Sequence, residues 1–172
     1  MRPLTVSLVL ALSACHLGYR VEVVDRPEVD PAGSDPHLAM ICVLRPQSFG
    51  ALASFQHYDN GRLVGVTQGA RVYFCYRVWP GGHQLTARSD NDADLAVNVM
   101  AGERCYVELR VNFGPDDLQP MAASEAQARL GQLRYVVATP QLAGVPPVCR
   151  DPVPELGSHG AVSGCPVVQT SL

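Results

Sequence analysis

Six cysteines are the side chains best suited to covalent chemistry in this sequence. A thiol can be acylated, can bind a soft metal or can form a disulfide. The sequence contains no Cys-x-x-Cys and no His-Glu-x-x-His, so neither a zinc site nor any other metal site is predicted. The chemistry open to the thiols then depends on the compartment of the protein. The cysteines stand at Cys15, Cys42, Cys75, Cys105, Cys149 and Cys165.

The first 14 residues follow the order of an export signal. Arg2 supplies one positive charge, residues 4–12 are largely apolar, and small residues precede Cys15. About nine apolar residues span roughly 14 Å as a helix, about half of the ~30 Å hydrocarbon thickness, so this segment is too short for a lasting anchor. We expect residues 1–14 to be a cleaved signal peptide; the alternative is a buried N-terminal strand.

The four residues Leu12-Ser13-Ala14-Cys15 resemble the lipobox of a bacterial lipoprotein signal peptide. The resemblance implies cleavage before Cys15, diacylation of its sulfur and acylation of the new amine. Two or more acyl chains anchor a protein stably, since each buried methylene contributes about 0.8 kcal/mol. His16 stands where an Asp commonly retains such proteins in the inner membrane, so the resemblance favours the periplasmic face or the surface of the outer membrane.

An exported protein meets an oxidising compartment, and its remaining cysteines favour disulfides. Cys149 and Cys165 bracket the Pro/Gly-rich tail, residues 139–172, and we predict that they pair. Closing a loop of about 15 residues would stabilise the fold by about 3 kcal/mol on the chain-entropy model. Three pairings stay open among the other thiols, Cys42, Cys75 and Cys105.

The length and the composition along the chain predict one domain with tails. Residues 15–37 are rich in Pro, Asp and Gly and are predicted to be a flexible tether. Over residues 38–138, short apolar runs alternate with turn signals, which indicates a small antiparallel β-sandwich. Asn60-Gly61 predicts a type I′ hairpin, because both central positions of that turn need positive φ. Strands are expected at residues 38–44, 51–58, 62–67, 71–79, 83–89, 95–100, 105–113 and 133–138.

Period-two alternation predicts which strand residues face the core. In residues 71–79 the even positions are apolar, and in residues 105–113 the odd positions, from Cys105 to Phe113, should point inward. One short helix is expected over residues 124–133, with Ser124 as its cap.

No sequence motif for catalysis is present. Gly-x-Ser-x-Gly, a papain-like cysteine context and Ser-x-x-Lys do not occur, and the chain has no Lys. Asp90, Asp92 and Asp94 resemble an oxygen-rich cation loop but lack the Gly and distal Glu of an EF-hand, so a solvated turn is expected. His83 follows Pro80-Gly81-Gly82 and is expected to fill a turn hydrogen bond or to lie exposed. The net charge of -3 does not indicate nucleic-acid binding.

Several aromatic residues fall near predicted turns. We expect them in the core or at sheet edges; the alternative is a platform that binds sugar or peptide. They are Tyr58, Tyr73, Tyr76, Trp79 and Tyr106.

Residues 38–137 are similar to a family of bacterial lipoproteins, the DUF2846-type domain of unknown function, and also to PEGA-like β-sandwiches associated with carbohydrate. The similarity rests on a hairpin at residues 57–65, Tyr73, the turn Trp79-Pro80-Gly81-Gly82-His83, an alternating strand at 95–99 and a Gly turn with its strand at 101–107. The pair Cys105-Tyr106 departs from the aromatic pair usual in that family. The resemblance implies a fold and a location, and no catalytic residue carries over.

These observations predict a membrane-anchored, non-enzymatic lipoprotein that serves as an interaction module of the cell envelope. Its partners would be the membrane, through the lipid on Cys15, and an envelope protein or glycan. No cofactor is predicted. The alternatives are a periplasmic hydrolase or metal-dependent enzyme with a spatially assembled site, and a carrier with an enclosed apolar cavity for a small ligand.

Overall fold

The computed structural model describes residues 19–25 and 35–140. The predicted signal peptide, Cys15 and the predicted Cys149–Cys165 pair lie outside these residues. The described elements are β1 (Tyr19–Val23), β2 (Ala39–Arg45), β3 (Ser54–Asp59), β4 (Arg62–Gln68), β5 (Val72–Val78), β6 (Gly81–Arg88), β7 (Asp92–Val99), β8 (Arg104–Arg110), β9 (Asp117–Met121), α1 (Ala123–Leu130) and β10 (Arg134–Pro140).

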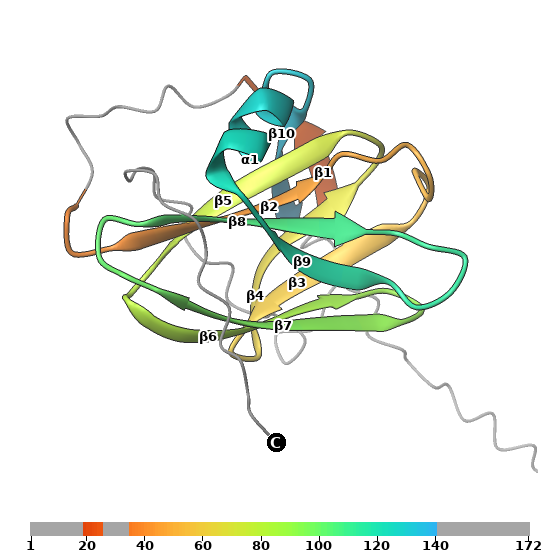
Figure 1. Cartoon of the computed structure of the whole chain (residues 1–172). Helices are drawn as coiled ribbons and strands as arrows, with labels where there is room; N and C mark the ends of the chain where they lie inside the picture. The colour runs from red at the N-terminus through yellow and green to blue at the C-terminus, as the bar shows by residue number, and fades with distance from the viewer. Residues whose placement is uncertain (1–18, 26–34, 141–172) are drawn as a thin grey trace, which may run out of the picture.

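Two sheets pack face to face, and α1 covers the outer face of the larger one (Figure 1). The six-stranded sheet has the order β1-β10-β5-β2-β8-β9, and the four-stranded sheet has the order β4-β3-β6-β7. This confirms the predicted small β-sandwich with one short helix near the C-terminal end of the domain. The pairing departs from the predicted antiparallel arrangement at two places: β2 with β8 and β10 with β5 are parallel. Both pairs join segments far apart in the sequence, and such long crossovers allow parallel pairing.

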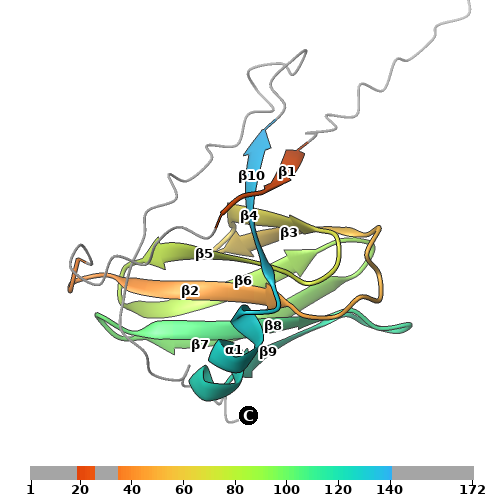
Figure 2. The ribbon, with the colours of Figure 1, turned by 90° about the horizontal axis from the view of Figure 1, so that it is seen from above.

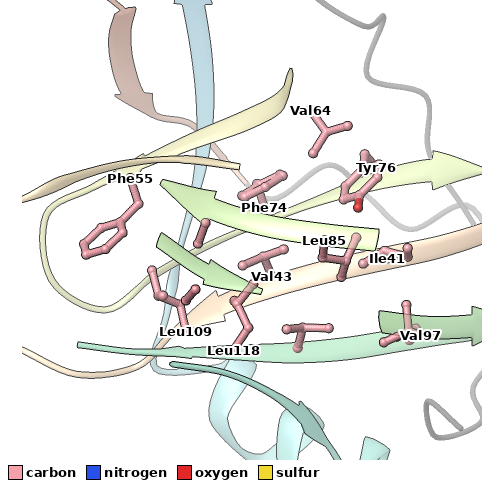
Figure 3. Close-up of a cluster of buried hydrophobic side chains, with 14 of the residues drawn as sticks. Ile41, Val43, Phe55, Val64, Phe74, Tyr76, Leu85, Val97, Leu109 and Leu118 are labelled. Atoms are coloured by element: carbon pink, nitrogen blue, oxygen red, sulfur yellow. The ribbon is translucent and has the colours of Figure 1, made fainter. Parts of the chain in front are cut away.

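The predicted alternation of β5 is confirmed. Its even-numbered residues, from Val72 to Val78, are buried between the sheets, where Phe74 and Tyr76 pack against side chains of both layers (Figure 3). At the hairpin between β3 and β4, Asn60 and Gly61 have φ values of 48° and 78°. Both are positive, as the predicted type I′ turn requires.

The outer face of β8 differs from the expected pattern. Cys105 and Val107 face the inter-sheet core as predicted, but Tyr106 and Glu108 on the opposite face are buried too. The reason is α1, which lies over this face of the sheet and forms a second apolar cluster there. The strand also ends early, at Arg110, so the prediction that Phe113 points inward is wrong.

Phe113 is 99% exposed and its ring lies 4.4 Å, centroid to centroid, from that of Phe49. The two rings stand on the loops that follow β8 and β2. Period-two alternation holds one residue beyond β8, to Val111, which is buried in the inter-sheet core. The loop that follows is free of that constraint.

The helix is shorter than expected and begins differently. It covers Ala123–Leu130, its N-cap is Ala122, and no side chain caps it, so Ser124 does not have the predicted role. Ala126 and Leu130 are buried. Packing of this apolar face against the sheet stabilises a helix that is too short to be stable alone.

Two strands were not predicted. β9 covers one edge of the larger sheet, and β1 pairs with β10 in antiparallel register from Tyr19↔Pro140 to Val23↔Val136. β1 lies inside the segment that was expected to be a tether. Together β1 and β10 project as a two-stranded arm beyond the rest of the sheet (Figure 2).

The structure decides one of the open disulfide pairings. Cys42 and Cys75 are bonded to each other, face each other across β2 and β5, and have Cα atoms 4.0 Å apart. Cys105 is disulfide-bonded as well.

Within residues 19–25 and 35–140, no helix has the length and apolar character needed to cross a membrane.

Candidate functional site

A groove of about 540 Å³ opens beside the turn between β5 and β6. It lies between the edge of β5 and the hairpin that joins β3 to β4. The edge of β5 is open here because β10 pairs with β5 only through Val72 and Tyr73 before it turns away. The lining residues are Asp59, Asn60, Arg62, Val64, Tyr76, Arg77, Val78, Trp79, Pro80, Gly81, Gly82 and His83.

Trp79 stands at the rim of this groove with 72% of its surface exposed. The turn that carries it is held by His83, whose Nε2 lies 2.9 Å from the carbonyl oxygen of Trp79. The Nδ1 atom of the same ring lies 2.9 and 2.8 Å from the two carboxylate oxygens of Asp59. One imidazole therefore joins the β3–β4 hairpin to the Trp79 turn, and the turn hydrogen bond predicted for His83 is confirmed.

The contacts of His83 indicate its protonation state. A carbonyl oxygen and a carboxylate can only accept hydrogen bonds, so both ring nitrogens must carry a proton to satisfy them. The hydrogen bond to Asp59 is the main cause that raises the pKa of His83 above 6.5, and partial burial opposes it. An imidazolium whose two N–H groups are already engaged holds the turn in place and is poorly suited to accept a proton as a general base.

Tyr76 lies beneath the same ion pair. Its hydroxyl group is buried and makes no hydrogen bond of standard geometry within the described residues. Burial raises the pKa of Tyr76 well above 10.0, and the nearby carboxylate of Asp59 raises it further. The phenol therefore stays neutral, and its interaction with Asp59 is that of a dipole beside a charge.

Two arginines give the groove its charge. Arg62 is exposed at the hairpin and Arg77 is partly exposed on β5, and neither makes a salt bridge within the part of the chain that the structure describes. The Nε atom of Arg77 is buried and lacks a hydrogen-bond partner among those residues. Because Asp59 is engaged by His83, the groove has an excess of positive charge.

Tyr73, Tyr76 and Tyr106 are buried, as expected, and the alternative, an aromatic platform, is only partly assembled. Trp79 is exposed at the groove, whereas Tyr76 is 4% exposed at its base. Tyr73 and Tyr106 belong to the apolar cluster under α1, away from the groove. Tyr58 lies beneath the guanidinium of Arg88, whose Cζ is 5.0 Å from the ring centroid.

Two of the three acidic side chains at residues 90–94 are engaged by side chains of β6. Asp92 forms a salt bridge with Arg88 at 3.2 Å, and the Asp94 carboxylate accepts a hydrogen bond from the Thr86 hydroxyl at 2.5 Å. Within residues 19–25 and 35–140, no group of three or more potential metal-ligating side chains comes together. These carboxylates stabilise the β6–β7 hairpin.

A second histidine, His57, is a buried structural residue. Its Nε2 lies 2.9 Å from the Thr67 hydroxyl oxygen, and its ring packs on Phe74. Burial, and secondarily the charge of Arg45, lowers the pKa of His57 to about 3, so the ring is neutral. The pocket that His57 helps to line between the sheets measures about 10 Å³, which is room for no more than a water molecule.

Sequence reasoning singled out Trp79 and His83 near a turn without assigning either one a binding role, and it missed three residues that complete the site. In the sequence, Asp59 is notable only as the residue before Asn-Gly, and no pattern there predicts its contact with His83. Arg62 and Arg77 were hidden among the 13 arginines of the chain. Their common position follows from the pairing of distant strands.

No protein-family model, no curated protein and no solved structure matches this chain.

Proposed function

We propose that the protein is a lipid-anchored, non-enzymatic lipoprotein of the bacterial cell envelope that binds an envelope protein or glycan in the groove beside Trp79. The observation that supports it most is the immobilised turn: the hydrogen bond from His83 to the Trp79 carbonyl holds an exposed indole over a positively charged groove. Tryptophan and arginine are enriched at binding surfaces.

The groove favours binding over catalysis. Among the residues that the structure describes, its lining contains no Ser, Thr or Cys that could act as a nucleophile. His83, the one histidine among those lining residues, has both ring nitrogens engaged. A hydrolase with a nucleophile activated by histidine needs a free basic nitrogen beside that nucleophile, so this alternative has less support.

The pocket beside His57, between the sheets and lined by described residues, is too small for a ligand and gives the carrier alternative no support. Ligand cavities typically measure about 300–1,000 Å³, whereas the pocket beside His57 measures about 10 Å³. The open groove lies in the usual range.

The anchor rests on the lipobox resemblance at Cys15. β1 begins at Tyr19, four residues later, and four extended residues span at most about 14 Å. A lipid on Cys15 would thus hold the arm formed by β1 and β10 close to the membrane. The DUF2846-type resemblance supports the same location.

The anchor is tested by expressing the full-length protein in a bacterium with an outer membrane. The native chain is expected in the membrane fraction with added acyl mass, and Cys15→Ser in the soluble fraction without it. An unchanged mass and an unchanged distribution would refute the anchor.

The binding function is tested with a photo-crosslinking residue placed at Arg62, in the groove, or at Asp90, on the distant β6–β7 hairpin. Adducts with an envelope component are expected from Arg62 and not from Asp90, and they should disappear when Trp79→Ala is added. Equal adducts from both positions, no adducts from either, or adducts that are insensitive to Trp79 would contradict the proposal.

A further inference from the structure

We propose that the ligand of the groove is an extended, acidic peptide segment of a partner protein, which adds a short strand to the open edge of β5 at Arg77. This inference rests on the proposed binding function and names the class of partner. It follows from three features: an unpaired strand edge, two capped neighbours on that edge, and the charge beside it.

The strand register shows which peptide groups of β5 face the groove. The N–H of Arg134 donates to the carbonyl oxygen of Arg71 at 2.9 Å, so the odd-numbered residues at the start of β5 direct their backbone groups toward β10. Backbone direction alternates along a strand, so Cys75 and Arg77 direct theirs to the same side. The 4.0 Å Cα separation of Cys42 and Cys75 fits this assignment, because pairs without mutual hydrogen bonds lie closer together.

β10 leaves this edge after Tyr73, and side chains cap the carbonyl groups on either side of Arg77. The Tyr135 hydroxyl donates to the carbonyl oxygen of Cys75 at 3.4 Å, and His83 donates to that of Trp79 at 2.9 Å. Between these caps, no described strand pairs with the peptide groups of Arg77. Natural edges are usually covered or blocked, and an uncovered stretch beside a groove is what strand addition uses.

The charge of the groove selects for acidic peptides. Arg62 and Arg77 lack carboxylate partners within residues 19–25 and 35–140, whereas the Asp59 carboxylate is occupied by His83. A carboxylate on the added strand could form a bidentate pair with a guanidinium. An adjacent apolar side chain could pack on the indole of Trp79. A glycan could use the indole and the arginines, but it would leave the backbone of Arg77 unused.

The probe is a displayed library of random ten-residue peptides, selected on the full-length protein and, in parallel, on Trp79→Ala. Sequences enriched only on the native protein should carry Asp or Glu next to alternating apolar residues. A synthetic copy of the most enriched peptide should lose affinity by about tenfold or more on Trp79→Ala and on Arg62→Glu, since truncating a central interface anchor has effects of this size. Arg110→Ala, on β8 away from the groove, is the matched control and should bind normally.

Strand addition has a signature that side-chain binding lacks. On adding the peptide, the backbone amide of Arg77 should become protected from hydrogen exchange. Arg77→Pro removes that N–H together with the guanidinium, so it should weaken binding much more than Arg77→Ala, which removes the guanidinium alone. Pro is tolerated at an edge position whose N–H faces away from the sheet, and circular dichroism checks that the variant is folded. If it does not fold, the exchange measurement on the native protein still decides.

The possible outcomes separate this inference from the proposed function. An acidic peptide that protects the Arg77 amide supports it. A peptide that binds without protecting this amide overturns strand addition. If the library yields nothing beyond the Trp79→Ala background while an acidic glycan binds in a manner that depends on Trp79, the peptide inference fails and the binding function stands. If neither class binds, both fail.

Discussion

The Nε2 atom of His83 lies 2.9 Å from the carbonyl oxygen of Trp79, and this contact places the chain's one tryptophan at the rim of the groove. Through its other nitrogen, the same ring is joined to Asp59 on the neighbouring hairpin. The β3–β4 hairpin and the Trp79 turn, joined by residues 24 positions apart in the sequence, are thereby held as one surface. This limits the entropy lost when a ligand binds.

The turn that carries Trp79 should become more mobile as pH rises. His83 has a folded-state pKa raised above 6.5, so the stability that it contributes is fully present below 6.5 and is lost as pH rises through the folded pKa. The fluorescence anisotropy of Trp79 should fall with a midpoint above pH 6.5. His83→Gln should remove this transition, and the exposed His37→Gln should keep it. An identical titration in His83→Gln would refute the assignment.

The buried His57 should make the protein less stable at acidic pH. Its pKa is lowered to about 3, so between pH 6.5 and about 3 the unfolded chain binds the proton and the folded chain does not. The free energy of unfolding should fall as pH falls through this range, with a slope of up to about 1.4 kcal/mol per pH unit. Urea unfolding at several pH values measures it. His57→Gln should show a shallower slope than His37→Gln, and equal slopes would contradict the prediction.

Gly65 on β4 is needed for close packing. A Cβ atom there would lie 2.7 Å from Cζ of Phe74, inside a core with no room to spare. Gly65→Ala should therefore lower the free energy of unfolding by about 1–3 kcal/mol, as overpacking does. Gly131→Ala after α1 is the control, because a Cβ meets nothing within 4 Å there and φ is -64°. Equal stabilities in thermal unfolding would show that Phe74 moves aside easily.

The Cys42–Cys75 bond should stabilise the sandwich. It closes a loop with a sequence separation of 33, for which the chain-entropy model gives about 4 kcal/mol. The double variant Cys42→Ala, Cys75→Ala avoids unpaired thiols. Its free energy of unfolding, measured in urea, should be lower by much of this value of about 4 kcal/mol. A loss below about 1 kcal/mol would mean that residual contacts between β2 and β5 already restrict the unfolded chain without the disulfide.

The disulfide of Cys105 makes two sequence predictions compete. Because Cys42 and Cys75 bond each other, the sequence offers a monomer three further cysteines: Cys15, Cys149 and Cys165. An acylated Cys15 and a Cys149–Cys165 bond therefore cannot both accompany it. If Cys15 is acylated, non-reducing digestion and mass spectrometry should find Cys105 linked to the C-terminal tail. A Cys105–Cys15 peptide would instead refute lipidation.

Local patterns were sufficient for much of the fold. Alternation located the core face of β5, and the Asn60-Gly61 pair located a hairpin whose two positive φ values the structure confirms. Local patterns failed where a residue's environment is made by a distant part of the chain. Alternation predicts that Glu108 is exposed, but α1 buries it. The segment that forms β1 reads as part of a tether, but it pairs with β10.

The sequence by itself determined the class of the fold, most strand positions, the inward face of β5 and the turn that carries Trp79, because these depend on residues within a few positions of one another. Tertiary structure alone decided that Cys42 pairs with Cys75, that Asp59 meets His83, and that the edge of β5 stays open at Arg77. Each of these depends on the register of strands brought together from distant parts of the chain, which is set by packing of the whole core.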